Sequence, residues 1–139
     1  MQTPINKRTD IKSIQKHSLL TGAFLLALVL SAKAVIDLGG LVSFTLQTLA
    51  LGIGYFLLPK IWRFVLILAY IALVIAGLSV FNGGVGWAYV ISWPLGFFVG
   101  FVLAAYISTP KKITLSNLFS YFLQIHIVIV TLGICVLGW

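Results

Sequence analysis

The sequence predicts an all-α integral membrane protein, built as a bundle of five transmembrane helices. Hydrophobic residues make up 61% of the 139-residue chain and charged residues only 8%, whereas a soluble domain usually carries about 25% charged residues. The apolar residues also form five continuous runs, each close to the ~20 residues that a helix needs to cross a bilayer. The runs lack the alternation of barrel strands, so helices are predicted.

The spans follow one another with short turns between them. A basic segment, residues 1–17, precedes the first span, and residues 18–139 are treated as a single transmembrane domain. Pro59 ends the second span, and Pro94 lies inside the fourth. In chain order, the predicted spans are residues 18–38, 42–58, 61–80, 87–107 and 118–139.

The basic residues predict the orientation. Those outside the first span lie before it or beside the turns that follow the second and fourth spans: Lys7, Arg8, Lys12, Lys16, Lys60, Arg63, Lys111 and Lys112. The other two turns carry no Lys or Arg, so the positive-inside rule places the N-terminus in the cytoplasm. Basic residues at the edges of apolar runs suit lipid headgroups, and the net charge of +7 is therefore not taken to indicate nucleic-acid binding.

Few side chains could support catalysis. The carboxylates are Asp10 and Asp37, and Cys135 is a single cysteine within an apolar run. The sequence contains no metal-ligand cluster, no nucleophile–base pair at a useful spacing and no phosphate-binding glycine loop followed by Lys. We therefore expect no enzymatic activity, no catalytic or metal-binding residues and no cofactor.

Lys33, Asp37 and His126 are ionisable residues inside predicted spans that could have a functional role. Lys33 and Asp37 are four residues apart and can pair on one helix face. We interpret them as an interfacial pair, with a gate at the outer mouth of a cavity as the alternative. His126 is interpreted as a neutral side chain that is hydrogen-bonded inside the bundle.

Small residues recur at four-residue spacing in three spans, which lets helix backbones approach closely. Internal packing explains most of these faces, although the face on the first span could instead contact another protein. The residues are Ala23, Ala27 and Ser31 in the first span, Ala72 and Ala76 in the third, and Gly96, Gly100 and Ala104 in the fourth.

Two polar segments interrupt the apolar pattern. In "LVSFTLQTLA", residues 41–50, the amide of Gln47 needs a partner, because an unsatisfied amide in hydrocarbon costs several kcal/mol. In "FNGGVGW", residues 81–87, the glycines allow close backbone approach and Asn82 offers donor and acceptor groups. Trp87 and Tyr89 add flat faces for stacking. Both segments lie on the predicted outer side and could line one outward-facing pocket, although a plain turn also explains the second segment.

At these residues the chain resembles the BioY family, the biotin-binding S components of energy-coupling-factor transporters. The family stretch "PVPFTLQTLAVLL" is matched here by "LVSFTLQTLALGI", residues 41–53. The family blocks "GPRLG", "GLPVFAGGxGG" and "GPTGGYLLGFLLAA" are matched in order by "LPKIW", "GLSVFNGGVGW" and "SWPLGFFVGFVLAA". The resemblance covers residues 19–139. The family's "PTGGY" becomes "PLGF" here, and the prolines around "FTLQT" are missing.

The resemblance implies a six-helix S-component-like fold, of which the last helix, after a "PGDxxK"-like motif, is expected to be absent. It also implies uptake of biotin across a bacterial cytoplasmic membrane, with an energy-coupling transmembrane subunit docking near Ala23 and Ala27 and separate ATPase subunits. The alternatives are a non-transporting remnant or membrane scaffold, and a carrier for another small vitamin. The residues expected to bind the substrate are Phe44, Thr45, Gln47, Asn82, Gly83, Gly84, Trp87 and Tyr89.

Overall fold

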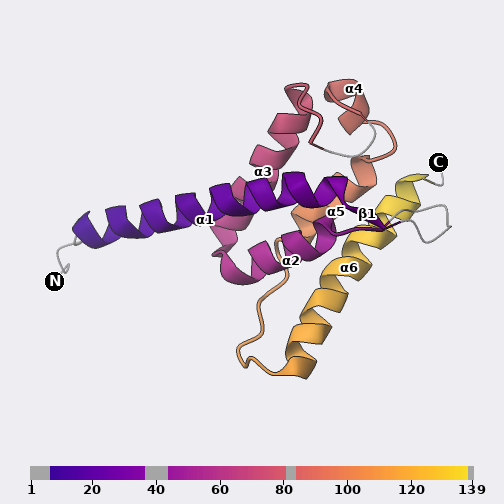
Figure 1. The fold of residues 1–139 in the computed structure, drawn as a ribbon. Helices are drawn as coiled ribbons and strands as arrows, with labels where there is room; N and C mark the ends of the chain where they lie inside the picture. The colour runs from indigo at the N-terminus through magenta and orange to yellow at the C-terminus, as the bar shows by residue number, and fades with distance from the viewer. Residues whose placement is uncertain (1–6, 37–43, 81–83, 138–139) are drawn as a thin grey trace.

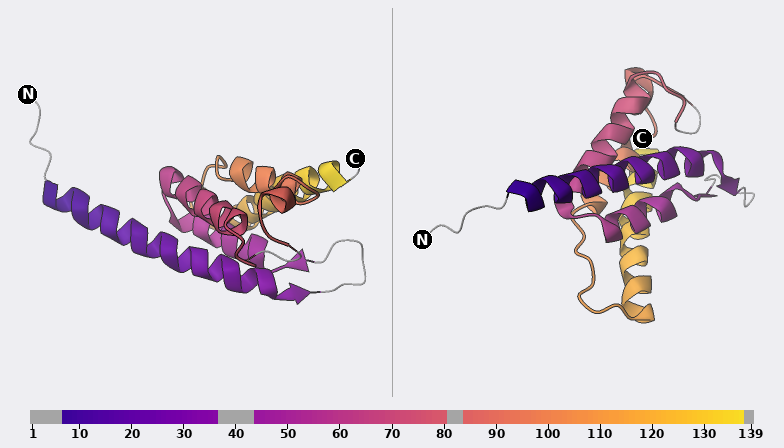
Figure 2. Two further views of the ribbon diagram at one scale, coloured as in Figure 1. Left: turned by 90° about the horizontal axis from the view of Figure 1, so that it is seen from above. Right: turned by 60° about the vertical axis from the view of Figure 1, so that its left-hand side comes forward.

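The structure is a computed structural model that describes residues 7–36, 44–80 and 84–137. In chain order its elements are α1 (Lys7–Lys33), β1 (Val35–Ile36), β2 (Phe44–Thr45), α2 (Gln47–Leu57), α3 (Lys60–Ile75), α4 (Trp87–Val90), α5 (Leu95–Ala104) and α6 (Leu115–Leu137) (Figure 1). Seen from above, α1 lies on one side and α5 and α6 on the other, with α2 and α3 between them (Figure 2). The predicted helical fold is therefore confirmed, apart from a short two-stranded sheet.

Helix α1 begins eleven residues earlier than the predicted first span, at Lys7 rather than residue 18. No Gly or Pro interrupts residues 7–21, and Asp10 in the first turn interacts favourably with the helix dipole. The polar N-terminal segment therefore continues the helix of the first apolar run, and it projects beyond the other helices (Figure 1). The helix ends at Lys33, before the predicted residue 38.

The polar stretch of residues 41–50 crosses a junction between strand and helix. Val35 pairs with Thr45 and Ile36 with Phe44 in an antiparallel ribbon, so the backbone of Phe44 and Thr45 is extended. The predicted helix start at residue 42 is therefore wrong, and α2 begins at Gln47. Because Phe44 and Thr45 satisfy their backbone groups by strand pairing, they cannot also be the first turn of α2.

Helix α3 ends at Ile75, five residues before the predicted end of the third span. Gly77 follows the C-cap with φ of 89°. Its N–H donates to Val74 O at 3.1 Å, and the N–H of Leu78 donates to Leu73 O at 3.1 Å. This is the Schellman arrangement, in which glycine adopts the left-handed conformation that terminates a helix.

The predicted fourth span is divided into two helices. Helix α4 ends at Val90, and α5 begins at Leu95, immediately after the buried Pro94. Proline lacks the N–H that a continuous helix would need and its ring clashes with the preceding turn, so a helix begins at this point rather than passing through it.

Small residues bring α5 and α6 into close contact, as their spacing predicts. A Cβ on Gly100 would lie 2.8 Å from Ile129 Cα, and one on Gly96 would overlap the backbone of Leu132. Gly133 of α6 lies against the ring of Phe97 in the same way. The interpretation of Gly96, Gly100 and Ala104 as a packing face is therefore confirmed, with Ala104 fully buried.

Arg63 lies beside the turn between α2 and α3, as predicted, but it is buried rather than exposed to lipid headgroups. Only 4% of the residue is exposed. Its Nε donates to Leu58 O at 2.9 Å, and its Nη1 donates to Ile107 O at 2.8 Å and to Ala105 O at 3.4 Å. These carbonyls lie at the carboxyl ends of α2 and α5, where cations interact favourably with unpaired helix carbonyls. Arg63 thus ties both helix ends to α3.

Two of the described helices are long and apolar enough to cross a membrane, α1 over Asp10–Lys33 and α6 over Leu115–Val136. Helices α2 and α5 are apolar but have only 11 and 10 residues, about half of the length that a span needs. The five full spans therefore remain a prediction.

Candidate functional site

A chain of hydrogen bonds connects the two polar segments. Gln47 Nε2 donates to Tyr70 Oη at 3.0 Å, and Tyr70 Oη donates to the carbonyl oxygen of Val80 at 2.8 Å. Val80 directly precedes the second polar segment. Gln47 is 3% exposed and Tyr70 is fully buried. The site therefore has a dry polar centre, formed by the first residue of α2, the middle of α3 and the segment that follows α3.

The local structure explains why Gln47 points inward. As the first residue of α2, it stands where the chain turns from the ribbon into the helix. A buried amide is stable only when it is hydrogen-bonded, and the phenol of Tyr70 supplies the partner. The expectation that Gln47 must face a partner inside the bundle is confirmed.

The glycines of the second segment hold a tight backbone conformation. Gly86 has φ of 84°, which favours glycine, and its N–H donates to Val74 O at 2.7 Å. A Cβ on Gly84 would overlap the ring of Tyr89, so this ring lies directly on the Gly84 backbone. The segment is thereby attached to the end of α3 and starts α4.

Aromatic rings surround one side of the polar centre. Tyr89 is half-buried, and its ring lies against the backbone of Gly84. Its ring meets Trp93 edge to face, with centroids 5.9 Å apart, and Trp93 meets Phe97 at 6.4 Å. Amide, phenol and aromatic groups together can bind a small molecule by hydrogen bonds and by stacking.

Of the residues predicted to bind a substrate, Gly84 and Tyr89 lie in contact, and Gln47 is connected through Tyr70 to Val80, just before their segment. Trp87 is 61% exposed and lies on the surface. Phe44 and Thr45 lie in β2, two residues before α2, and their side chains are outside the described part of the structure. Asn82 and Gly83 also lie outside the described residues. Substrate binding by this set stays a prediction.

The small-residue face of α1 is only partly covered. Ala23 is exposed and Ala27 is half-buried. A Cβ on the neighbouring Gly22 would meet no atom within 4 Å. This part of α1 is therefore accessible to another protein or to lipid.

Lys33 and His126, two of the ionisable residues in the predicted spans, each have a hydrogen-bond partner. Lys33 Nζ donates to Ser79 Oγ at 3.2 Å, while its predicted partner Asp37 lies outside the described residues. His126 Nδ1 is 2.8 Å from the carbonyl oxygen of Phe122, one turn earlier in α6, and donates to it. The hydrogen-bonded interpretation of His126 is confirmed. No group of His, Cys, Asp and Glu within the described ranges could hold a metal ion.

Tyr70 is the residue of this site that the sequence does not reveal. Its only polar group is one hydroxyl within the apolar run of α3. Membrane proteins are enriched in Tyr where the bilayer meets water, so a Tyr in an apolar run does not by itself indicate a binding site. The sequence does not show which face of α3 lies opposite Gln47, and Tyr70 therefore cannot be chosen as its partner from the sequence. The burial of Arg63 is likewise not evident from the sequence, because it depends on contacts with the end of α5.

The fold and the site define an all-helical membrane protein with a buried polar centre at one end of its helices. The BioY family model matches residues 4–139, and the chain belongs to the BioY family. Its members are membrane transport components rather than enzymes, which agrees with the apolar helices described above. No curated protein matches the chain, and no solved structure does.

Proposed function

We propose that the chain is the membrane-embedded component that binds biotin from the outer side for uptake. The match to the BioY family over residues 4–139 carries the proposal. The hydrogen-bond chain from Gln47 through Tyr70 to Val80 supports it, because it joins the two polar segments that the family resemblance assigns to the substrate site. Phe44, Thr45, Asn82, Gly83 and Trp87 are proposed to complete this site.

The chemistry of the site suits biotin. The ureido ring of biotin has two N–H donors and a carbonyl acceptor, which complement an amide and a phenol. The edge-to-face rings of Tyr89 and Trp93 offer apolar surface for the sulfur-containing ring. Because a carrier for another small vitamin would need different donors and acceptors, competition experiments distinguish the two functions.

The energy for uptake would come from other subunits. We propose that an energy-coupling transmembrane subunit contacts α1 at Ala23 and Ala27, and that separate ATPase subunits hydrolyse ATP. The exposure of Ala23 and the open space beside Gly22 support this surface. The protein would lie in a bacterial cytoplasmic membrane with its N-terminus inside. Replacing Ala23 by Trp should prevent uptake while leaving biotin binding intact.

The test is biotin binding to the purified chain in detergent, measured by isothermal titration. We expect saturable binding at micromolar or lower biotin, with no competition by thiamine or riboflavin. Gln47→Met preserves side-chain length and should weaken binding at least tenfold. Gln124→Met is the matched control, because Gln124 is exposed on α6 and its Nε2 donates to Ser120 Oγ, one turn away, at 3.3 Å. Absence of binding by the unaltered chain at micromolar biotin would overturn the proposal and favour a scaffold or remnant.

A further inference from the structure

A polar pocket lies at the opposite end of α2 from Gln47. Its volume is about 430 Å³. Its polar lining comes from His17 of α1, Lys60 and Arg63 of the first turn of α3, and Ser108 and Thr109 after α5. Phe56 and its neighbours at the end of α2 form an apolar wall. The proposed substrate site uses none of these residues.

The pocket is basic and no carboxylate lines it. Lys60 and Arg63 carry positive charge, and His17 adds an imidazole. The chain contains only two acidic residues, Asp10 and Asp37; Asp37 lies outside the described part of the structure, and Asp10 does not line the pocket. The backbone carbonyls at the ends of α2 and α5 offset part of the charge of Arg63, so the charge of Lys60 is the one left without a partner of opposite charge in the pocket lining. Within the described ranges, the pocket thus has a positive charge that no acidic side chain balances, and it favours an anion.

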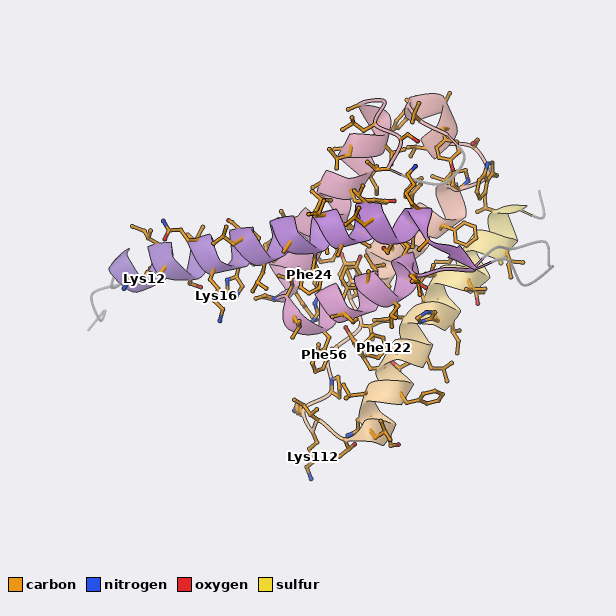
Figure 3. The ribbon with its side chains drawn as sticks, in the orientation of Figure 1. Lys12, Lys16, Phe24, Phe56, Lys112 and Phe122 are labelled. Carbon is orange, nitrogen blue, oxygen red and sulfur yellow. The ribbon has the colours of Figure 1, made fainter. Side chains whose placement is uncertain are left out.

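Apolar side chains stand beside this basic pocket. Leu57 is 53% exposed and Ile61 is 67% exposed, one on each side of Pro59 and Lys60. Further basic residues surround the same end of the helices: Lys12 and Lys16 lie on the projecting part of α1, and Lys112 lies on the segment that leads to α6 (Figure 3). Basic groups beside apolar surface match the level where phospholipid headgroups meet acyl chains.

We propose that this pocket binds the phosphate of an anionic phospholipid. Lys60 and His17 face the phosphate, and Ser108 and Thr109 can donate hydroxyl hydrogen bonds to its oxygens. The acyl chains would run over Leu57 and Ile61 toward the lipid-facing surface. The apolar rim favours a lipid over free phosphate or an acidic peptide, since neither of those would cover exposed leucine and isoleucine.

The test measures lipid binding to the full chain in detergent by native mass spectrometry, with phosphatidylglycerol and with phosphatidylcholine. We expect phosphatidylglycerol to be retained preferentially, with one molecule held most strongly. Lys60→Gln should weaken that binding about fivefold, the factor that corresponds to one basic contact near a lipid surface. Lys112→Gln is the matched control, because it removes the same charge at the same end of the molecule but outside the pocket.

Three outcomes overturn the proposal. Equal weakening by both variants would mean that surface charge alone attracts the lipid, and weakening by neither would mean that Lys60 does not contact the phosphate. Displacement of phosphatidylglycerol by an equimolar amount of inorganic phosphate, or of an acidic peptide, would assign the pocket to that ligand instead.

Helix content by circular dichroism and biotin binding should be unchanged in Lys60→Gln, because the substrate site lies at the other end of α2. Failure of biotin binding in the unaltered chain would leave this test intact.

Discussion

Gln47 at the start of α2 and Tyr70 on α3 form a buried side-chain hydrogen bond of 3.0 Å across 23 residues of sequence. The hydroxyl of Tyr70 in turn donates to Val80 O, so this one phenol holds the start of α2 and the segment after α3 together. Substitution of Tyr70 tests this link, and substitutions of other buried residues test the packing of the helices.

Tyr70→Phe should lower the thermal unfolding temperature in detergent and weaken biotin binding. The change removes the acceptor of Gln47 and the donor to Val80, and a buried polar group left without a partner costs about 1–3 kcal/mol. Tyr106→Phe is the control, because Tyr106 is 61% exposed and its ring contacts Phe64 by an edge. Equal unfolding temperatures for the two variants would contradict a structural role for the Tyr70 hydroxyl.

Tyr55→Phe and Tyr121→Phe should have different effects. Tyr55 Oη donates to Phe101 O at 2.7 Å, which links α2 to α5, so its loss should cost about 1 kcal/mol. Tyr121 is 3% exposed, and its Oη has no hydrogen-bond partner among the described residues. Removing that hydroxyl should therefore leave stability unchanged or slightly raised. Thermal unfolding of both proteins in one detergent is the measurement, and a larger loss for Tyr121→Phe would refute the argument.

Gly100→Ala should destabilise the contact between α5 and α6. The new methyl group would meet the backbone of Ile129 at 2.8 Å, and such overpacking typically costs about 1–3 kcal/mol. Gly22→Ala places the same methyl group in open space on α1, where alanine favours the helix by about 1 kcal/mol over glycine. The two unfolding temperatures should move in opposite directions, and a stable Gly100→Ala protein would argue against this close approach.

Arg63→Met should be strongly destabilising, by about 2–4 kcal/mol, because hydrogen bonds to charged groups contribute about 1.5–3 kcal/mol each. The carbonyl groups at the ends of α2 and α5 would lose the guanidinium that donates to both of them. Methionine fills similar space but cannot donate a hydrogen bond. Lys60→Met, in the same turn but exposed, should have little effect on unfolding. Hydrogen exchange at residues 105–107 gives a local readout, which should rise only in Arg63→Met.

Local features of the sequence predicted a substantial part of the fold. The packing face of Gly96 and Gly100, the inward amide of Gln47 and a hydrogen bond of His126 are confirmed, although His126 bonds within its own helix. Each depends on residue type and near spacing within a single segment. Helix ends were predicted less well, because a strand pairing at Phe44 and Thr45, a proline at residue 94 and a left-handed glycine at residue 77 override the apolar pattern.

By itself the sequence determined that this is an apolar helical membrane protein and that it resembles the BioY family. The first property depends on the average hydrophobicity and charge along the chain, and the second on the order of short sequence motifs. Neither property requires knowledge of which side chains are in contact. Only the tertiary structure decided that Gln47 bonds to Tyr70, and that Arg63 is buried against carbonyls 42 and 44 residues away. The physical reason is that a polar group in an apolar protein must find a partner, and which partner it finds depends on how distant helices pack.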